Sequence, residues 1–255
     1  MDNRKPMVLK IGGGEVDSPE FLQRMSAVVA SVKRPLVIVH GAGKEIGRLL
    51  DKLGLEVRFV EGLRVTDDKA IEVVEMVLSG LVNKRITGEL QKKGLKALGF
   101  SGRDLGLIKA KKLTSPAGLG HVGEPNLLNV LILHRMLELG WLPVVSPVSQ
   151  DESGSVLNIN ADHVAQKAAV GLKAAELVFL SNVPAVLEGD HEIGALSGEN
   201  AEKLIKMEVI TGGMVPKVRS ALTALEGGVQ KVLITDIQGL ERYLEGKTVS
   251  TMITK

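Results

Sequence analysis

Short, uninterrupted apolar runs alternate along the chain with segments in which apolar residues recur at helical spacing. The runs are Met7–Ile11, Pro35–Val39, Leu142–Val145, Leu177–Leu180 and Val232–Thr235. A run that is apolar throughout, rather than at every second position, is typical of a strand buried on both faces. The pattern therefore predicts a parallel sheet that is covered by helices on both sides.

Three segments between these runs place apolar residues at positions i, i+3, i+4 and i+7, which predicts amphipathic helices. They are Ile46–Leu53, Ala161–Leu172 and Val215–Leu225. The alternation of buried strands with amphipathic helices indicates an α/β fold. Open α/β sheets bind ligands beyond the carboxyl ends of their strands, so we expect the site in the loops that follow the apolar runs.

Composition excludes several classes of function. The 255 residues carry a net charge of only +2 and include one Trp, one Tyr and four Phe. Such a chain lacks both the basic surface and the stacking platforms of a nucleic-acid-binding protein. It has no cysteine, which excludes disulfides and cysteine-based metal sites. Its apolar runs are far shorter than the roughly 18 residues of a membrane span. We expect a cytoplasmic protein that binds neither nucleic acid nor a membrane.

Glycine clusters occur in three loops next to the predicted elements. Gly12-Gly13-Gly14 follows the first apolar run, Gly41-Ala42-Gly43 follows the second, and Gly212-Gly213 precedes a predicted helix. Glycine lets backbone N–H groups approach phosphate or carboxylate oxygens, and a following helix adds the positive end of its dipole. A single cluster is as consistent with a tight turn, but three of them near strand ends predict an anion-binding site.

Two lysines lie where a cation is unfavourable without a partner. Lys10 lies inside the first apolar run, and Lys217 lies in the first turn of the helix that follows Gly213. Burial of an ammonium group is costly, and the helix dipole repels a cation at its N-terminus. Either lysine alone is consistent with a solvated surface residue. Beside the glycine loops, however, the two together favour contact with a bound anion.

A polar cluster, Asn158-Ile159-Asn160-Ala161-Asp162, opens one of the predicted helices. Helix capping is the ordinary interpretation of such residues. The alternative is that Asp162 anchors the two lysines while an Asn amide contacts a substrate. Arg64 lies shortly before a helical pattern that starts near Asp68. Its guanidinium is suited to clamping a carboxylate, or equally to an ordinary surface ion pair.

The five histidines are scattered without the spacing of metal ligands. We therefore predict no metal site built from protein side chains, and mainly structural roles for the histidines. His40 adjoins a glycine cluster, and we expect it to orient that loop.

Taken together, these segments resemble the amino-acid kinase family, and the resemblance covers nearly the whole chain. The matching motifs, in chain order, are Met7-Val8-Leu9-Lys10-Ile11-Gly12-Gly13, Val37-Ile38-Val39-His40-Gly41-Ala42-Gly43, Gly62-Leu63-Arg64-Val65-Thr66-Asp67, Gly120-His121-Val122-Gly123, Asn158-Ile159-Asn160-Ala161-Asp162 and Gly212-Gly213-Met214-Val215-Pro216-Lys217-Val218. Each motif alone is weak, whereas six of them in order at family-like spacing form a specific signal.

The resemblance implies a three-layer αβα sandwich with a mainly parallel open sheet and two lobes. Residues 1–172 would bind the acyl substrate and form a dimer, and residues 173–255 would bind the nucleotide. The implied activity is ATP-dependent phosphorylation of the side-chain carboxylate of N-acetyl-L-glutamate to N-acetyl-glutamyl 5-phosphate, the second step of arginine biosynthesis. Mg²⁺ would accompany ATP, held mainly by phosphates and water.

The resemblance also assigns roles to matching positions. Lys10 and Lys217 resemble the lysines that stabilise the transferring phosphoryl group, and Asp162 resembles the aspartate that positions both. The substrate-binding positions are Ala42, Gly43, Arg64 and Asn158, with Arg64 on the α-carboxylate. The nucleotide-binding positions are Gly12, Gly13, Asn182, Val183, Pro184, Ala185, Val186, Leu187, Val209, Ile210 and Thr211.

Three residues depart from the family pattern. Ala42 replaces the usual middle glycine of its loop, Lys44 stands where many relatives have proline, and Asn182 stands where the family usually has aspartate. Alternative substrates are carrier-linked aminoadipate or glutamate, as in lysine biosynthesis. The alternative outside the enzymes is a non-catalytic anion-binding module. The intact Gly62–Asp67 segment favours N-acetyl-L-glutamate.

Arginine-inhibited hexameric members of the family carry an additional N-terminal helix. The chain begins only about nine residues before Lys10, without such a helix. We therefore expect a homodimer that is insensitive to arginine.

Overall fold

The computed structural model describes residues 5–14, 16–189, 191–247 and 251–254. Its strands are β1 (Met7–Ile11), β2 (Leu36–His40), β3 (Phe59–Val60), β4 (Leu63–Arg64), β5 (Ala97–Ser101), β6 (Ile108–Lys112), β7 (Val122–Leu128), β8 (Leu142–Ser146), β9 (Val148–Gln150), β10 (Val156–Ile159), β11 (Glu176–Leu180), β12 (Leu187–Glu188), β13 (His191–Glu192), β14 (Ala195–Ser197), β15 (Lys231–Thr235) and β16 (Thr251–Thr254). Its helices are α1 (Pro19–Ser31), α2 (Gly43–Lys52), α3 (Asp68–Glu75), the π-helix η1 (Met76–Val82), α4 (Asn83–Lys92), the 3-10 turn η2 (Asp104–Gly106), α5 (Val130–Glu138), α6 (Ala161–Gly171), α7 (Gly198–Lys206), α8 (Met214–Glu226) and α9 (Ile237–Leu244).

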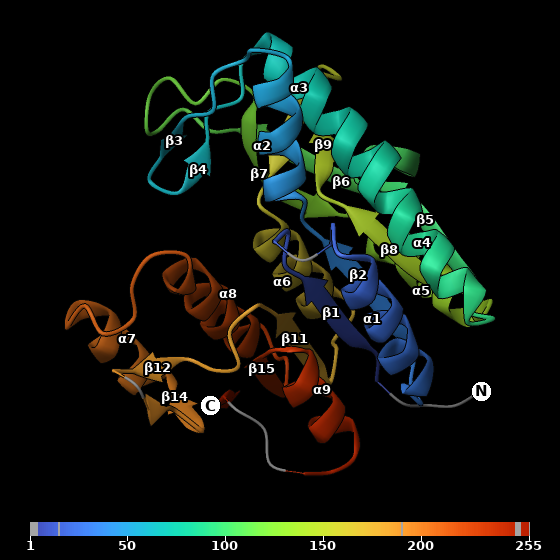
Figure 1. Cartoon of the computed structure of the whole chain (residues 1–255), viewed down its shortest axis with the longest axis vertical. Coiled ribbons are helices and arrows are strands. Elements are labelled where there is room, and N and C mark those ends of the chain that lie inside the picture. The colour runs from blue at the N-terminus through green and yellow to red at the C-terminus, as the bar shows by residue number, and fades with distance from the viewer. Residues whose placement is uncertain (1–4, 15, 190, 248–250, 255) are drawn as a thin grey trace.

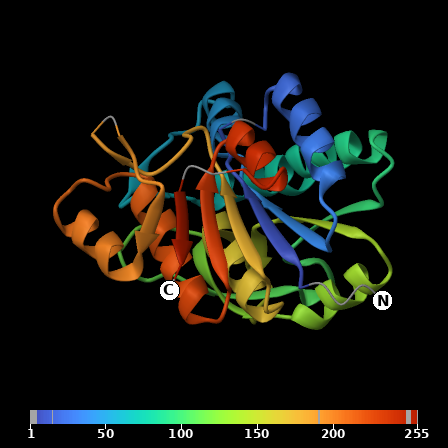
Figure 2. The same ribbon diagram turned by 90° about the horizontal axis from the view of Figure 1, so that it is seen from below.

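An eight-stranded sheet forms the centre of the molecule, in the order β14-β16-β15-β11-β1-β2-β8-β5 (Figure 1). Its neighbouring strands run parallel, except for the β15–β16 pair. The five predicted strands are β1, β2, β8, β11 and β15, and they lie side by side in this sheet. The predicted helices are α2, α6 and α8. The α/β prediction with a mainly parallel sheet is confirmed, and helices cover both faces (Figure 2).

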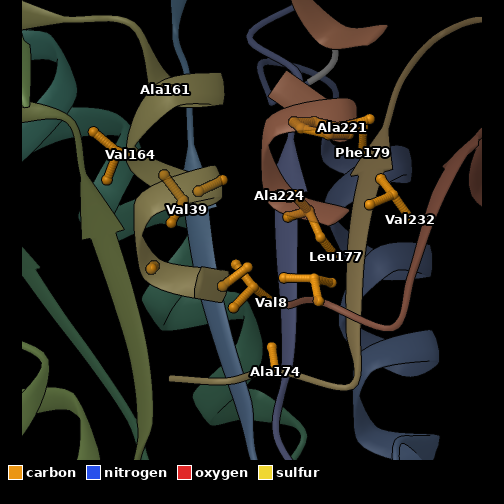
Figure 3. Packing of buried hydrophobic residues seen from close by; sticks show 14 of the residues in the cluster. Val8, Val39, Ala161, Val164, Ala174, Leu177, Phe179, Ala221, Ala224 and Val232 are labelled. Atoms are coloured by element: carbon orange, nitrogen blue, oxygen red, sulfur yellow. The ribbon is translucent and has the colours of Figure 1, made fainter. Parts of the chain in front are cut away.

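Alternate residues of each central strand feed two separate cores. In β1, Val8 packs into the cluster under α5, α6 and α8, whereas Met7 and Leu9 pack into the cluster under α1, α2 and α4. In β11, Leu177 and Phe179 face the α6 and α8 side (Figure 3). Because side chains alternate along a strand, Lys10 lies on the same face as Val8 and is directed toward α6.

A second, smaller sheet was not predicted from the sequence. Strands β10, β7, β6 and β9 close into a small barrel beside the main sheet. The exposed Lys109, Lys111 and Lys112 interrupt apolarity in β6, and Pro125 lies within β7. Half-exposed strands of this kind lack the uninterrupted apolar run that marks a central strand.

Local capping explains where the helices next to the site begin. Asn160 caps α6, because its side chain accepts a hydrogen bond from the backbone N–H of Asp162 at 2.8 Å. Asp67 caps α3 by accepting from the N–H groups of Lys69 and Ala70. The helical pattern predicted from Asp68 is confirmed, and it continues through η1 and α4. Within the described part of the chain, no helix combines the length and apolarity needed to cross a membrane.

Candidate active site

Two glycine loops meet at the carboxyl ends of the neighbouring strands β1 and β2. A Cβ atom on Gly13 would lie 2.5 Å from the backbone nitrogen of Gly43 and 2.7 Å from that of Ala42. No other residue fits there without moving the backbone, so glycine is required for this contact. The loop after β1 is also tied to β11, since the N–H of Gly12 donates to the carbonyl of Leu180 at 3.0 Å.

The two predicted lysines converge on one buried carboxylate. The Nζ atom of Lys10 lies 2.7 Å from Oδ1 of Asp162, and the Nζ atom of Lys217 lies 3.5 Å from Oδ2. Lys10 comes from the centre of the sheet, Asp162 from the first turn of α6, and Lys217 from the first turn of α8. One carboxylate shared by two ammonium groups leaves a net charge of +1, which can attract an anion.

Burial dominates the electrostatics of this group. It lowers the pKa of the Lys10 ammonium, an effect that Asp162 opposes and that Lys217 reinforces. For Asp162, burial alone disfavours the charged form, but the ammonium groups of Lys10 and Lys217 together hold its pKa below the ordinary value. The carboxylate is therefore ionised at neutral pH and keeps both lysines in place.

A cavity of about 390 Å³ lies against the second glycine loop. It contains all four of the predicted substrate positions, Ala42, Gly43, Arg64 and Asn158. Its size is at the small end of the range for ligand pockets, which suits a small organic acid. We call this space the acyl cavity.

Arg64 enters the acyl cavity from the β3–β4 hairpin. Its guanidinium lies over the ring of Phe59, 4.7 Å from the ring centroid, and its Nη2 donates to the carbonyl of Gly43 at 2.8 Å. Its Nη1 is buried and has no hydrogen-bond partner in the described part of the chain. Burial lowers the pKa of the guanidinium, an effect that Asp51 partly offsets. An unpaired buried donor of this type is what a ligand carboxylate satisfies.

The polar cluster before α6 divides into two kinds of residue. Asn160 is the helix cap, as described above, so the capping interpretation holds for that residue. Asn158 is directed elsewhere, with its Nδ2 donating to the hydroxyl of Thr66 at 3.2 Å. Asp162 caps nothing and faces the lysines instead.

His40 is held rigidly beneath the second glycine loop. The side-chain Nδ2 of Asn83 lies 3.1 Å from its Nε2, and its Nδ1 lies 3.3 Å from the carbonyl oxygen of Gly41. The same Nδ2 donates to the carbonyl of Val144 at 2.9 Å. With Asn83 donating, the imidazole is neutral and donates from Nδ1. Complete burial lowers the pKa of His40 to about 4, so this arrangement persists at neutral pH.

Residues 5–236 match the sequence profile of the amino acid kinase family. The chain belongs to the amino acid kinase family. The acetylglutamate kinase of Chloroflexus aurantiacus is 45% identical over 236 residues, covering 91% of this chain and 92% of that one. The acetylglutamate kinase of Methanopyrus kandleri is 42% identical over 249 residues, covering 94% and 97%. The crystal structure of smu.665 from Streptococcus mutans superposes with a TM-score of 0.84 at 30% identity, covering 98% of both chains.

The nucleotide-binding positions predicted from the sequence lie in the loop after β1 and in the segments after β11 and α7. The structure gives the predicted nucleotide positions two different environments. Ala185, Val186 and Ile210 are buried, so their side chains pack in the core rather than face an open nucleotide site. Asn182 and Thr211 are exposed. Val186 and Ile210 belong to the same apolar cluster, which ties the two segments to one core.

Two features of the site were missed from the sequence. Phe59, which supports Arg64, is more than half exposed and follows no glycine loop, so nothing in its local sequence marks it. Asn83 lies in a long helical segment, where its contact with His40 depends entirely on the tertiary fold. The available signal was a polar residue on an otherwise apolar helix face, which is a common and unspecific pattern.

Proposed function

We propose that this chain phosphorylates the side-chain carboxylate of N-acetyl-L-glutamate with ATP, giving N-acetyl-glutamyl 5-phosphate, and that it acts in the second step of arginine biosynthesis. The observation that carries the proposal is the shared Lys10–Asp162–Lys217 group beside a cavity with an unpaired arginine donor. The similarity to acetylglutamate kinases over nine-tenths of the chain supports the choice of substrate.

The reaction needs little acid–base chemistry. A carboxylate oxygen of the acyl substrate forms a bond to the γ-phosphorus as the bond from phosphorus to the β–γ bridging oxygen breaks, and ADP leaves with that electron pair. The nucleophile is already ionised, so no proton has to be removed. Catalysis then consists of aligning two anions and stabilising the charge on the transferring phosphoryl group.

The group around Asp162 is suited to that task. Lys10 and Lys217 approach one carboxylate from different elements, which fixes both ammonium groups before any ligand binds. Charges that are held in advance need little reorganisation during the reaction, and a buried setting strengthens their effect. We propose that Lys10 and Lys217 contact the transferring phosphoryl group and that Asp162 positions them.

The acyl cavity supplies recognition of the other reactant. We propose that Nη1 of Arg64 binds the α-carboxylate of the substrate, since it is buried without a partner. The backbone N–H groups of Ala42 and Gly43, at the start of α2, and the amide of Asn158 complete the substrate contacts. An α-carboxylate in this place replaces a missing hydrogen bond with a charge-assisted one.

We propose that ATP binds across the carboxyl ends of β1 and β11, with its phosphates against Gly12 and Gly13 and its nucleoside near 182–187 and 209–211. Asp162 already serves two lysines, so Mg²⁺ is expected to arrive bound to phosphate oxygens and water. The N-terminal lobe, residues 1–172, would hold the acyl substrate, and residues 173–255 the nucleotide.

We also propose a homodimer. Apolar side chains are exposed on η1, namely Met76 and Leu81, beside the edge strand β5. A second copy placed on this face would cover them and the open edge of the sheet. Sedimentation equilibrium tests the proposal, and a monomer at micromolar concentration contradicts it.

The test of the reaction is the formation of an acyl phosphate, trapped as a hydroxamate with hydroxylamine. The purified chain is incubated with ATP and Mg²⁺ and, in turn, with N-acetyl-L-glutamate, glutamate, aspartate or N-acetyl-aminoadipate. We expect a strong preference for N-acetyl-L-glutamate. A preference for another acid contradicts the substrate assignment, and no hydroxamate from any acid contradicts the proposed reaction.

A further inference from the structure

Lys44 is a cation at the start of α2, where helix chemistry disfavours it. It is the second residue of the helix, and the N-cap residue, Ala42, has no side-chain hydrogen bond to offset the positive dipole. A cation at a helix N-terminus is destabilising unless an anion lies nearby. Within the described residues, its ammonium group has neither a hydrogen bond nor an ion pair, and the side chain is exposed.

The side chain of Lys44 crosses from one glycine loop to the other. It lines the acyl cavity, yet its Cε and Nζ atoms lie 3.5 Å and 3.7 Å from the place where a Cβ atom on Gly14 would be. Gly13 is packed against the backbone of Ala42 and Gly43 at the same junction. The ammonium group of Lys44 therefore lies between the space proposed for the acyl substrate and the loop proposed for the phosphates of ATP.

The reactants carry more negative charge than the two lysines around Asp162 neutralise. The pair of lysines around Asp162 contributes a net charge of +1, because the carboxylate cancels one of them. The reaction brings together a carboxylate and a triphosphate, and its transition state spreads charge over the equatorial oxygens of the phosphoryl group. The ammonium group of Lys44, between the two glycine loops, would add positive charge beside those oxygens.

We propose that Lys44 is a further catalytic residue, whose ammonium group contacts the phosphoryl group as it passes from ATP to the acyl carboxylate. The inference rests on the proposed function. In the transfer, the new oxygen–phosphorus bond forms to the acyl carboxylate while the bond to the leaving ADP breaks, and Lys44 gains and loses no proton. Its role is to stabilise the negative charge on the equatorial oxygens of the phosphoryl group in the transition state.

The test compares Lys44→Met and Lys44→Arg with a matched control, Lys69→Met. Lys69 is also an exposed lysine in the second position of a helix, α3, but it lines neither the acyl cavity nor a glycine loop. Hydroxamate formation gives kcat and both KM values. We expect Lys44→Met to lower kcat by about tenfold or more, less than the loss of a buried oriented donor, because Lys44 is exposed and its charge is screened by solvent. The KM for N-acetyl-L-glutamate should stay within about twofold of the wild type, since losing an interaction made only in the transition state lowers kcat and kcat/KM together.

Charge retention and binding separate this role from a structural one. Lys44→Arg should recover most of the lost kcat, and Lys69→Met should match the wild type. Calorimetry with Mg²⁺, ADP, aluminium fluoride and N-acetyl-L-glutamate should show affinity for this mimic of the transition state reduced in Lys44→Met by about the same factor as kcat. Affinity for Mg²⁺ and ADP without fluoride should change much less.

Two results would overturn the inference while leaving the proposed reaction intact. One is a Lys44→Met enzyme with wild-type kcat, and the other is a loss confined to the KM for the acyl substrate. Either result requires that the wild type forms the hydroxamate. A wild type that forms none overturns the proposed function and this inference together.

Discussion

Two buried carboxylates are each shared by two cations. Asp162 lies near the carboxyl ends of the central strands, and Glu176 lies at the start of β11. Around Asp162 the cations are the two lysines of the candidate site. Around Glu176 they are Arg34 and Lys231, each 3.1 Å from Oε1, which also accepts a hydrogen bond from the hydroxyl of Tyr243 at 2.7 Å. We call the second group the Glu176 cluster.

Both carboxylates are paired with two cations, but the cations differ in how far they are exposed to solvent. Lys10 is almost completely buried, with a side-chain exposure of 7%, whereas Arg34 and Lys231 are about one-third exposed, at 32% and 33%. The Glu176 cluster lies at strand starts, and the ring of Tyr243 covers the Lys231 ammonium at 4.9 Å. Asp162 instead pairs with two lysines beside the glycine loops that follow the neighbouring strands β1 and β2. From this difference we expect similar ion groups to stabilise the fold at the strand starts and to bind an anion at the carboxyl ends of the strands.

The largest expected effect comes from removing one cation from each of the two carboxylates. We expect Lys217→Ala to lower kcat for hydroxamate formation by about a hundredfold or more, because an oriented charge on the phosphoryl group is lost. Lys231→Ala, the matched change in the Glu176 cluster, should leave kcat within about twofold of the wild type. Circular dichroism confirms that both variants are folded. A folded Lys217→Ala enzyme with near-normal kcat would falsify the assignment of the site.

A second prediction tests the role of Arg64 in the acyl cavity. Arg64→Ala removes the unpaired donor of the acyl cavity, and we expect the KM for N-acetyl-L-glutamate to rise by about thirtyfold, from the loss of about 2 kcal/mol of charge-assisted bonding. The KM for ATP should change little. Arg58→Ala is the control, because Arg58 is an exposed arginine just before the same hairpin. Equal effects of the two changes on the KM for the acyl substrate would contradict a specific role for Arg64.

A third prediction uses pH, because the glycine-loop end of the sheet depends on a neutral His40. Its pKa falls from 6.5 in the unfolded chain to about 4 in the folded one, so between these values the unfolded state binds more protons. The neutral His40 therefore contributes to the free energy of unfolding above pH 6.5, and this contribution is lost as the pH falls toward 4.

Between pH 7 and pH 5 this linkage amounts to about 2 kcal/mol of unfolding free energy. Urea denaturation should show that the wild type loses about that much more stability over this interval than His40→Gln, which has no titrating group there. A nuclear magnetic resonance titration of the wild type provides an independent reading. An imidazole of His40 that protonates near pH 6.5 would contradict the burial argument.

The central sheet was predictable because its strands are buried on both faces, which leaves an uninterrupted apolar run such as Leu177–Leu180. Lys10 was predictable as a site residue for the same reason, since a cation stands out in such a run. The small barrel and the support of Arg64 by Phe59 were not predictable, because half-exposed strands and a lone aromatic carry no distinct local pattern. The Asn83–His40 contact joins residues 43 positions apart, and only the fold brings them together.

The smallest expected effect tests whether the Glu176 cluster is structural. Tyr243→Phe removes the hydroxyl that donates to Glu176 but keeps the ring over Lys231. We expect the unfolding free energy to fall by about 1–2 kcal/mol, because a buried carboxylate loses one hydrogen bond while both of its cations remain. The kcat for hydroxamate formation should not change, since Tyr243 contacts Glu176 and Lys231 at the strand starts and not the residues of the candidate site. Urea denaturation and the hydroxamate assay measure the two quantities on the same sample. A fall in kcat without a fall in stability would mean that the Glu176 cluster affects the candidate site, and it would contradict a purely structural role for that cluster.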